Sequence, residues 1–330
     1  MFNQIKQKIE KQLSRGEFNG INFDEALKLS KLEKTADIVD LLNLANKVQL
    51  KFKKNHIIKC ASVNIPPYKC QEDCKFCALS VHNKAKLTKK DLNILETVDE
   101  IVETAKRMEK LGAERFKMVA GGRGLNKKTL EMITEASKRI KKETKLSICA
   151  SCGLLPSLEI AKELKKAGVD RYNCNFETSR SFFPNICTTH SYDDKIKSIK
   201  IAKQAGMDHC GGCLMGLGES VEQRIELAFD IKKYGGSSMP YNMLVPIPGT
   251  PMENAKPVPA MELLKFLAIY RLIMPKKDII CNAGRTHNLR DLQALALIGG
   301  ANGLVYRTYL TAPGRTPEDD MKMIKDLGFY

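Results

Sequence analysis

The sequence has no run of about 18 apolar residues, the length that a helix needs to cross a membrane. Its first residues, MFNQIKQKIEKQL, are amphipathic and rich in lysine, and they lack the apolar block of a secretory signal peptide. We therefore expect a soluble, cytoplasmic protein with no membrane partner.

The sequence also lacks tryptophan and the paired metal-ligand sets of a basic zinc protein that binds nucleic acid. The net charge of +16 would suit a phosphate backbone if the basic residues gathered on one face. They are instead spread along the predicted helices, as in Lys127, Lys128, Lys138, Lys141, Lys142, Lys162, Lys165, Lys166, Lys195, Lys197, Lys200 and Lys203. We interpret these lysines as solvated helix faces, which could still attract small anions, and expect no nucleic-acid partner.

Cysteine is abundant, with 11 residues in the chain. The cytosol keeps thiols reduced, so clustered cysteines there more often bind metal or take part in chemistry than form disulfides. The cysteine content therefore favours a metal-binding or redox function over a disulfide scaffold.

The pattern of apolar residues changes near residue 55. Residues 1–54 read as helices and are predicted to form an N-terminal helical cap, whereas 55–330 alternate short β-rich runs with helices. We predict strands at 57–65, 114–120, 145–150, 170–176, 207–214, 239–245, 278–283 and 303–308. Helices between them have readable ends, with a capping box from Thr97 to Glu100 and stops at Gly112, Gly168 and Gly206. The pattern predicts an α/β fold, a (β/α)8 TIM-type barrel with a C-terminal tail, whose active site lies at the carboxyl ends of the strands.

Three cysteines lie close together directly after the first predicted strand. Cys70, Cys74 and Cys77 have the spacing CxxxCxxC, with Phe76 before the last of them. Four cysteines would close a metal shell, whereas three leave one coordination position free. One alternative is a zinc knuckle that takes a fourth ligand such as His82, and another is reduced thiols without a function.

The spacing resembles that of the radical S-adenosylmethionine (SAM) superfamily. The resemblance implies a [4Fe-4S] cluster on Cys70, Cys74 and Cys77, whose open iron is chelated by SAM, and reductive cleavage of SAM to a 5'-deoxyadenosyl radical. The segment from Gly212 to Glu219 resembles the GxIxGxxE pattern that packs against adenine in these enzymes, with Leu214 in place of isoleucine and Gly216 as the next glycine.

Within this superfamily the chain resembles the biotin synthase family from about residue 40 onward. The matching segments are CQEDCKFC, RYNCNFETS, CTTHSYDDK, CGGCLMGLGE, YNMLVPIPGTP, CNAGR and YLTAPGRTPEDD. The resemblance implies insertion of sulfur between C6 and C9 of dethiobiotin, with an auxiliary iron–sulfur cluster as the sulfur source. It also implies a homodimer and a flavodoxin or ferredoxin-type electron donor.

The same resemblance assigns roles to polar residues near the strand ends. Asn175 and Glu177 would reach the ribose of SAM, and Lys195 replaces an arginine that pairs with the SAM carboxylate. A lysine keeps that charge but loses the bidentate geometry. Asn173, Asn175 and Asn242 would contact substrate or nucleoside, and Thr311 would lie near the substrate carboxylate. Alternation along a strand would place Asn173, Asn175 and Glu177 on one face.

The family pattern breaks at the auxiliary cluster. Cys149, Cys210 and Arg285 match three of its four family positions, but the fourth is Lys117, which is a poor iron ligand. We expect Cys149, Cys187 and Cys210 to hold a different auxiliary cluster, of four irons or otherwise [2Fe-2S], with Lys117 and Arg285 nearby. Such altered biotin synthases resemble those of strict anaerobes. The weaker candidates are Cys152, Cys174 and Cys213, and Cys60 and Cys281 are interpreted as packing residues.

Because Lys117 stands where the family has cysteine, a second function remains open. The chain could be another biotin-synthase-like radical SAM enzyme that catalyses a different rearrangement or a cofactor maturation step.

Overall fold

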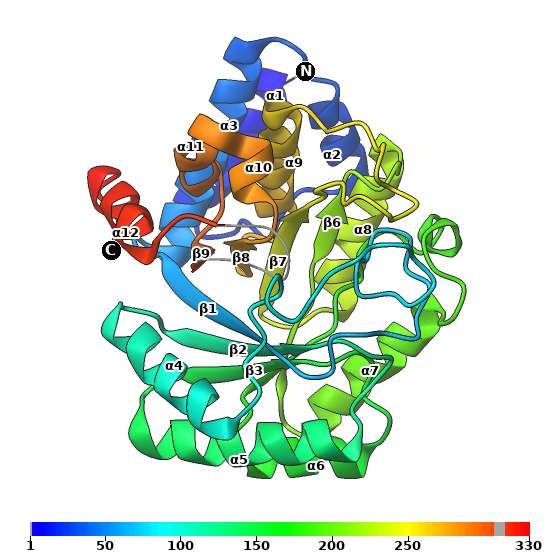
Figure 1. Cartoon of the computed structure of the whole chain (residues 1–330). Coiled ribbons are helices and arrows are strands. Elements are labelled where there is room, and N and C mark those ends of the chain that lie inside the picture. Colours follow the sequence, from blue (N-terminus) through cyan, green and yellow to red (C-terminus); the bar gives the residue numbers. More distant parts are fainter. Residues whose placement is uncertain (1, 307–313) are drawn as a thin grey trace.

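The computed structural model describes residues 2–306 and 314–330, and within them one closed parallel sheet forms the centre of the molecule. Its strands are β1 (Ile58–Ile65), β2 (Arg115–Ala120), β3 (Ser147–Ser151), β4 (Arg171–Asn173), β5 (Asp208–Cys210), β6 (Cys213–Met215), β7 (Ser238–Met243), β8 (Asp278–Cys281) and β9 (Gly303–Tyr306). They lie in the order β5-β4-β3-β2-β1-β9-β8-β7-β6, and the pair Cys210 and Ser238 joins β5 to β7 and closes the ring. The predicted barrel is confirmed (Figure 1).

The fifth predicted strand, 207–214, is divided into β5 and β6 by two glycines. A Cβ atom on Gly212 would lie 1.8 Å from the carbonyl oxygen of Pro240, and one on Gly211 would lie 2.0 Å from the ring of His209. The backbone passes so close to its neighbours here that only glycine fits, and the strand pairing is interrupted.

The helices that follow the strands lie outside the ring. They are α4 (Val98–Lys110), α5 (Lys127–Glu143), α6 (Leu158–Lys166), α7 (Tyr192–Gln204), α8 (Val221–Tyr234), α9 (Ala260–Ile273), α10 (Arg285–Leu289), α11 (Gln293–Ile298) and α12 (Pro317–Asp326), with short 3-10 turns η1 (Phe183–Asn185) and η2 (Arg290–Leu292). The predicted capping box at Thr97 and Glu100 begins α4. Gly112, Gly168 and Gly206 each lie two residues beyond a helix end, as predicted.

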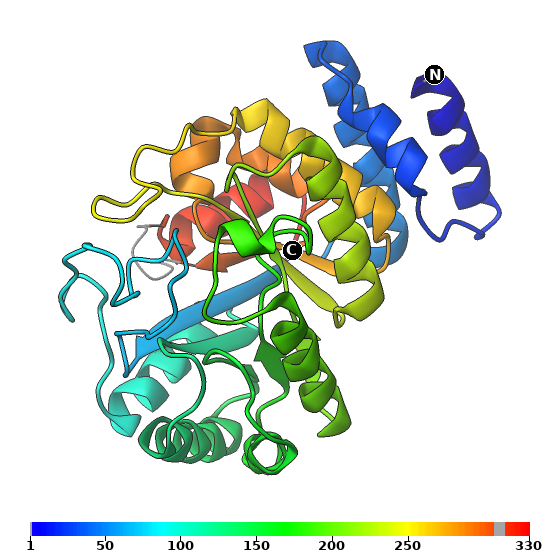
Figure 2. The ribbon, with the colours of Figure 1, turned by 90° about the vertical axis from the view of Figure 1, so that its right-hand side faces the viewer.

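Three helices precede the barrel: α1 (Phe2–Ser14), α2 (Phe23–Ser30) and α3 (Thr35–Lys53). Figure 2 shows α1 projecting from the barrel, at the upper right. Leu41, Leu44 and Val48 of α3 are buried, and α3 packs against α9. The Ile21 N–H donates to the Leu272 carbonyl at 3.0 Å. These contacts fix the helices to one side of the barrel, and a domain boundary at residue 54 stays a prediction.

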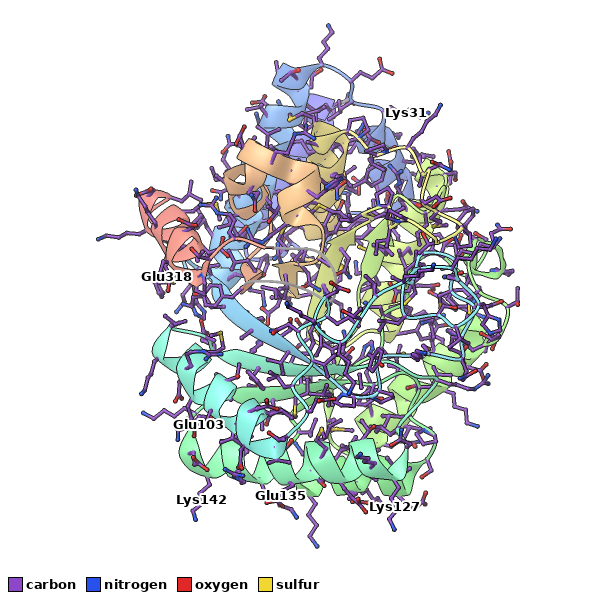
Figure 3. The ribbon with its side chains drawn as sticks, viewed as in Figure 1. Lys31, Glu103, Lys127, Glu135, Lys142 and Glu318 are labelled. Atoms are coloured by element: carbon purple, nitrogen blue, oxygen red, sulfur yellow. The ribbon has the colours of Figure 1, made fainter. Side chains whose placement is uncertain are left out.

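The charged residues lie largely on the outer faces of the helices. Lys127, Glu135 and Lys142 of α5 are exposed and point away from the barrel (Figure 3). The lysines named along α5, α6 and α7 are exposed except Lys195, which is buried. In the described part of the chain, every helix is too short or too polar to cross a membrane.

Loops from the carboxyl ends of three strands meet over one mouth of the barrel. In the loop after β1, the Lys75 N–H donates to the Ile186 carbonyl after β4 at 3.0 Å, and the Lys84 N–H donates to the Gly249 carbonyl after β7 at 2.7 Å. In Figure 2 the loops after β1 (cyan) and β7 (yellow) project to the left together. This arrangement brings the three-cysteine loop to the position where a barrel enzyme binds its ligands.

Candidate cofactor and metal sites

The three-cysteine loop faces a cavity at the barrel mouth, called here the first cavity. Cys70, Cys74 and Cys77 all line this cavity, whose volume is about 190 Å³. The Cys77 N–H donates to the Cys74 carbonyl at 3.0 Å, and the Asn83 amide donates to the carbonyls of Cys74 and Cys77 at 3.1 and 2.8 Å. The backbone is thereby folded so that the three cysteines line one cavity. Thiolates are the ligands that iron–sulfur clusters require, so the donor set fits a cluster held by three protein ligands.

His82 does not complete a zinc knuckle with these cysteines. Its ring lies 3.0 Å from the carbonyl oxygen of Gln71 (Nε2···O), and it does not line the first cavity. Among the described residues, the group compact enough for a single metal ion is instead Cys74, Cys187 and His190, whose ligand atoms lie within 4.8 Å of one another. The thiol nearest the three-cysteine loop is therefore Cys187.

Cys187 lies beside Cys74 and His190, which line the first cavity, because its loop is hydrogen-bonded to the three-cysteine loop. Its sulfur is 3.2 Å from Nδ1 of His190, whose ring contacts Glu72 in a short hydrogen bond. Cys74 donates to the Cys187 thiol, which outweighs the effect of burial and, with His190, lowers the pKa of Cys187 to about 4. The Asp73 carboxylate accepts the Thr188 N–H at 2.8 Å. The expected grouping of Cys187 with Cys149 and Cys210 is wrong, because these bonds hold Cys187 beside Cys74.

Four polar residues predicted near SAM line the first cavity together: Asn173, Asn175, Glu177 and Lys195. Strand β4 ends at Asn173, and Glu177 takes a left-handed backbone conformation with φ of 68°, so the predicted single strand face is replaced by a turn. The Lys195 ammonium donates to the Asn175 carbonyl at 2.9 Å.

Burial and neighbouring groups shift the pKa values of Glu177 and Lys195, which both line the first cavity. Burial raises the pKa of the Glu177 carboxyl, although Lys195 partly offsets this. Burial would lower the pKa of Lys195, but the neighbouring Cys174 thiol and the Glu177 carboxyl raise it overall. Lys195 therefore stays an ammonium and supplies a buried positive charge at the cavity wall.

A second cavity of about 140 Å³ adjoins the first, because Phe76, Cys77, Leu79, Asn175 and Glu177 line both. Leu214 and Asn242 also line the second cavity, as do apolar residues from β7 and the loop that follows it. Asn242 is engaged by the backbone, since its amide donates to the Cys213 carbonyl at 2.8 Å and its oxygen accepts from Asn282 at 2.7 Å. The cavity is lined mostly by apolar residues with few polar groups, which suits a nucleobase.

The glycine-rich segment after β6 is shaped by its own glutamate. Glu219 accepts the N–H groups of Gly216 and Leu217 at 3.0 and 2.6 Å, and it pairs with Arg224 at 2.8 Å. Glu219 therefore stabilises the loop through its backbone N–H groups and does not line either cavity.

A third cavity lies inside the barrel and is called the barrel cavity. Cys60, Lys117, Cys149 and Cys210 line it, from β1, β2, β3 and β5, together with Arg115 and Arg171. Cys149 donates to Cys210, which lowers the pKa of Cys210 to about 6 despite burial and raises the pKa of Cys149. Lys117 also lowers the pKa of the Cys210 thiol. The predicted proximity of Cys149, Cys210 and Lys117 is thus present.

One prediction about this region is wrong, and one residue has a further contact that was not predicted. Arg285 does not line the barrel cavity, because it begins α10 and forms a buried ion pair with Asp320 of α12. Cys60 packs against Ile58, Ile280 and Val305 as predicted, and it also lines the barrel cavity. Cys281 remains a buried packing residue, and Thr311 lies outside the described residues.

Sequence reasoning also missed two residues that organise the first cavity. Glu72 joins His190 and accepts the Thr189 hydroxyl at 2.5 Å, and Arg123 donates to the Thr189 carbonyl at 2.7 Å. The sequence signal for Glu72 was its position between Cys70 and Cys74, two candidate metal ligands. A buried charge so close to a metal site needs a partner within the protein, so a contact such as that with His190 could have been expected.

Two family models match the chain. The model of the radical SAM superfamily covers residues 64–231, and that of the Biotin and Thiamin Synthesis associated domain covers residues 240–330. Membership of the radical SAM superfamily implies a [4Fe-4S] cluster and SAM as cofactors, and the donor set of the first cavity fits them.

Solved structures share the fold at low sequence identity. Methylornithine synthase has a TM-score of 0.82 at 20% identity, covering 97% of this chain and 96% of its own. HydG, a maturase of the FeFe-hydrogenase, has a TM-score of 0.81 at 19% identity, covering 100% of this chain and 76% of its own. At these identities the likeness concerns the fold alone.

Curated relatives match over nearly the whole length. The biotin synthase of Carboxydothermus hydrogenoformans is 43% identical over 330 residues, which is 99% of both chains. That of Heliobacterium modesticaldum is 42% identical over 98% of both chains, and that of Clostridium acetobutylicum is 43% identical over 96% of both. The chain belongs to the biotin synthase family of the radical SAM superfamily.

Proposed function

We propose that the protein is a biotin synthase that inserts sulfur between C6 and C9 of dethiobiotin. The observation that carries this proposal is the combination of two thiol sets on one barrel: three cysteines at the mouth and further cysteines in the barrel cavity below. The near full-length identity to biotin synthases supports the same reaction.

Cys70, Cys74 and Cys77 would hold the [4Fe-4S] cluster, and Phe76 would wall the SAM site. When bound, this cluster and SAM supply the 5'-deoxyadenosyl radical that abstracts hydrogen from dethiobiotin. Lys195 places a buried positive charge where the SAM carboxylate would bind, and Glu177 and Asn175 offer acceptors for the ribose hydroxyls. The second cavity, with Leu214 and the loop built on Gly212 and Gly216, would take the adenine.

Dethiobiotin would occupy the mouth between the SAM site and the barrel cavity. Asn173 is the residue best placed to contact it, because its side chain lines the first cavity and donates to the Cys210 carbonyl at 2.6 Å. Asn242 and Thr311 stay proposed contacts of the substrate on family resemblance. The wall of the second cavity is largely apolar, which would help to exclude water from a radical reaction.

The auxiliary cluster would bind in the barrel cavity and, when bound, supplies the inserted sulfur. We propose a four-iron cluster, because Lys117 takes the place of one thiolate that a two-iron cluster of this family would use. Cys149 and Cys210 would be ligands, and Lys117 would offset the negative charge. A flavodoxin or ferredoxin-type donor would reduce the SAM cluster, the functional unit would be a homodimer, and the protein would act in the cytoplasm of an anaerobe.

The test is an anaerobic incubation of reconstituted protein with SAM, a reductant and dethiobiotin deuterated at C6 and C9. We expect biotin and 5'-deoxyadenosine that carries deuterium. Cys74→Ala should abolish both products, and Cys281→Ala, a buried cysteine away from the cavities, should keep them. Failure of the unaltered, cluster-loaded protein to make biotin would refute the proposal.

One observation favours a second candidate function. Lys117 replaces an auxiliary ligand, as would be expected of a radical SAM enzyme that catalyses another rearrangement or a maturation step. Deoxyadenosine released without deuterium and without biotin would support this candidate.

A further inference from the structure

We propose that Cys60, Cys149 and Cys210 are the three protein ligands of the auxiliary cluster, so that β1 supplies the thiolate that β2 lacks. This inference rests on the proposed function only in assuming that an auxiliary cluster is present. It replaces Cys187 in the set expected from the sequence and assigns a ligand role to Cys60.

The register of the barrel places these cysteines on its inner side. Lys117 pairs with Cys149 across β2 and β3, and Cys60 pairs with Arg115, which lies two residues before Lys117. Arg115 and Lys117 both line the barrel cavity, so Cys60 faces the same space as they do. Cys149 and Cys210 are close enough to hydrogen-bond, and Cys60 lines the same cavity as both. The three sulfurs therefore surround one cavity from three different strands.

The remaining cavity wall suits an anionic cluster. Among the lining residues in the described part of the chain, there is no carboxylate, imidazole or fourth thiol. Arg115, Lys117 and Arg171 instead place three cationic side chains around the cysteines. A buried group of thiolates and iron with net negative charge is costly unless cations offset it. Lys117 supplies such a charge, and Arg115 and Arg171 offset part of the remainder, because they also pair with Asp278 and Asp208.

Other cysteines are excluded by position. Cys187 is held beside Cys74 and His190 at the mouth. Cys281 lies next to Ile280, which lines the barrel cavity, so alternation turns Cys281 to the outer side, where it is buried in the apolar core. Cys152, Cys174 and Cys213 do not line this cavity.

The number of thiolate ligands limits the type of iron–sulfur cluster that the barrel cavity can bind. A two-iron cluster needs four protein ligands, whereas a four-iron cluster with three leaves one iron open to a ligand from outside the protein. The cavity volume is about 30 Å³, so the cysteines and Lys117 must turn away from the barrel axis when a cluster enters. A wider barrel interior is therefore expected in the cluster-loaded protein than in this structure.

The experiment isolates the auxiliary cluster. In a full-length chain carrying Cys70→Ala, Cys74→Ala and Cys77→Ala, any iron left after anaerobic reconstitution belongs to the barrel cavity. We expect about four irons and four acid-labile sulfides per chain, with Mössbauer and visible spectra of a four-iron cluster. Adding Cys60→Ala, Cys149→Ala or Cys210→Ala should each remove most of the iron and the visible absorption.

Two matched variants serve as controls. Cys281→Ala removes a buried strand cysteine that faces away from the cavity, and Cys187→Ala removes the ligand expected from the sequence; both should keep the iron. Circular dichroism reports folding, and Cys60→Ser, which preserves shape, takes the place of Cys60→Ala if the alanine variant does not fold.

Retention of the full iron count and spectrum in the Cys60 variant would overturn the inference, as would loss of iron in Cys187→Ala but not in Cys60→Ala. Absence of iron from the triple variant itself would also overturn it. None of these results depends on whether the unaltered protein makes biotin, so failure of the ligand assignment is distinguishable from failure of the proposed function.

Discussion

The ammonium of Lys195 donates a 2.9 Å hydrogen bond to the main-chain carbonyl of Asn175, which ties the first turn of α7 to the turn that follows β4. Both residues line the first cavity, and Lys195 is buried while the other lysines of α5, α6 and α7 are exposed. A buried lysine that keeps its charge marks a position where an anionic group of a ligand can be bound.

Lys195→Met should weaken SAM binding, because the variant removes the positive charge from the cavity wall. A hydrogen bond to a charged group contributes about 1.5–3 kcal/mol, so the SAM concentration for half-maximal deoxyadenosine formation should rise by about 10- to 100-fold. Lys195→Arg keeps the charge and should remain within a few-fold of the unaltered protein. Equal losses in both variants would point to a packing role instead.

Glu219→Gln should loosen the glycine-rich loop beside the second cavity, which is proposed to bind adenine. The carboxylate accepts two backbone N–H groups and pairs with Arg224, so its loss should lower the free energy of unfolding by about 1–3 kcal/mol and raise the KM for SAM. Glu222→Gln, an exposed change three residues along the same segment, is the control and should alter neither value. If both variants behave alike in urea unfolding and SAM titration, the loop does not depend on Glu219.

Asp278→Asn should destabilise the end of the barrel opposite the mouth. Asp278 is the first residue of β8, and it pairs there with Arg115 and Lys53 at 2.6 and 2.9 Å. Breaking a partly buried ion pair costs on the order of 3 kcal/mol. Asp40→Asn removes an exposed pair with Lys6 and should cost less than about 1 kcal/mol. Urea unfolding of the cluster-free protein at pH 7 measures both.

The effect of Asp278 should also depend on pH. Burial alone would raise the pKa of Asp278, but Arg115 and Lys53 lower it from 3.8 to about 2. The stabilisation is therefore fully present above pH 3.8 and is lost as the pH falls toward 2, so the stability difference between unaltered protein and Asp278→Asn should narrow in that interval. A difference that stays constant from pH 5 to pH 3 would contradict the ion-pair explanation.

Lys117→Met should lower the reduction potential of the auxiliary cluster, because a nearby positive charge favours the more negative reduced state. Lys117→Arg keeps the charge and should shift the potential little. Lys59→Met, on the same barrel but paired with Glu114 outside the cavity, is the control. Potentiometric titration followed by electron paramagnetic resonance gives the values, and an unchanged potential in Lys117→Met would place the cluster elsewhere.

The barrel could be predicted from the sequence because each strand and helix carries its own local signal. Thr97 and Glu100 form their capping box within four residues, and it begins α4 as expected. The division of the fifth strand was not predictable in the same way, because it depends on the carbonyl of Pro240, a neighbour in a different strand. The short motifs also sufficed to place Cys70, Cys74 and Cys77 together.

The assignment of the remaining cysteines failed because it depends on contacts between distant loops. Cys187 follows β4 but is held by Glu72 and Asp73 more than 110 residues earlier. From the sequence, Cys60 is interpreted as a packing residue because it lies within a predicted strand, and only the register with Arg115 shows that it faces inward. Arg285 matched a short family segment, yet α10 turns it toward Asp320.

The central claim is that three protein thiolates leave one iron of the mouth cluster for SAM. Electron–nuclear double resonance on the reduced protein, loaded with SAM labelled with ¹⁵N in its amino group and ¹⁷O in its carboxylate, tests this directly. The account predicts strong coupling of both labels to the cluster, unchanged in Cys187→Ala. Absence of coupling, or coupling that arises only when Cys187 or His190 is removed, would show that a side chain beside Cys74 occupies that iron and would contradict the account.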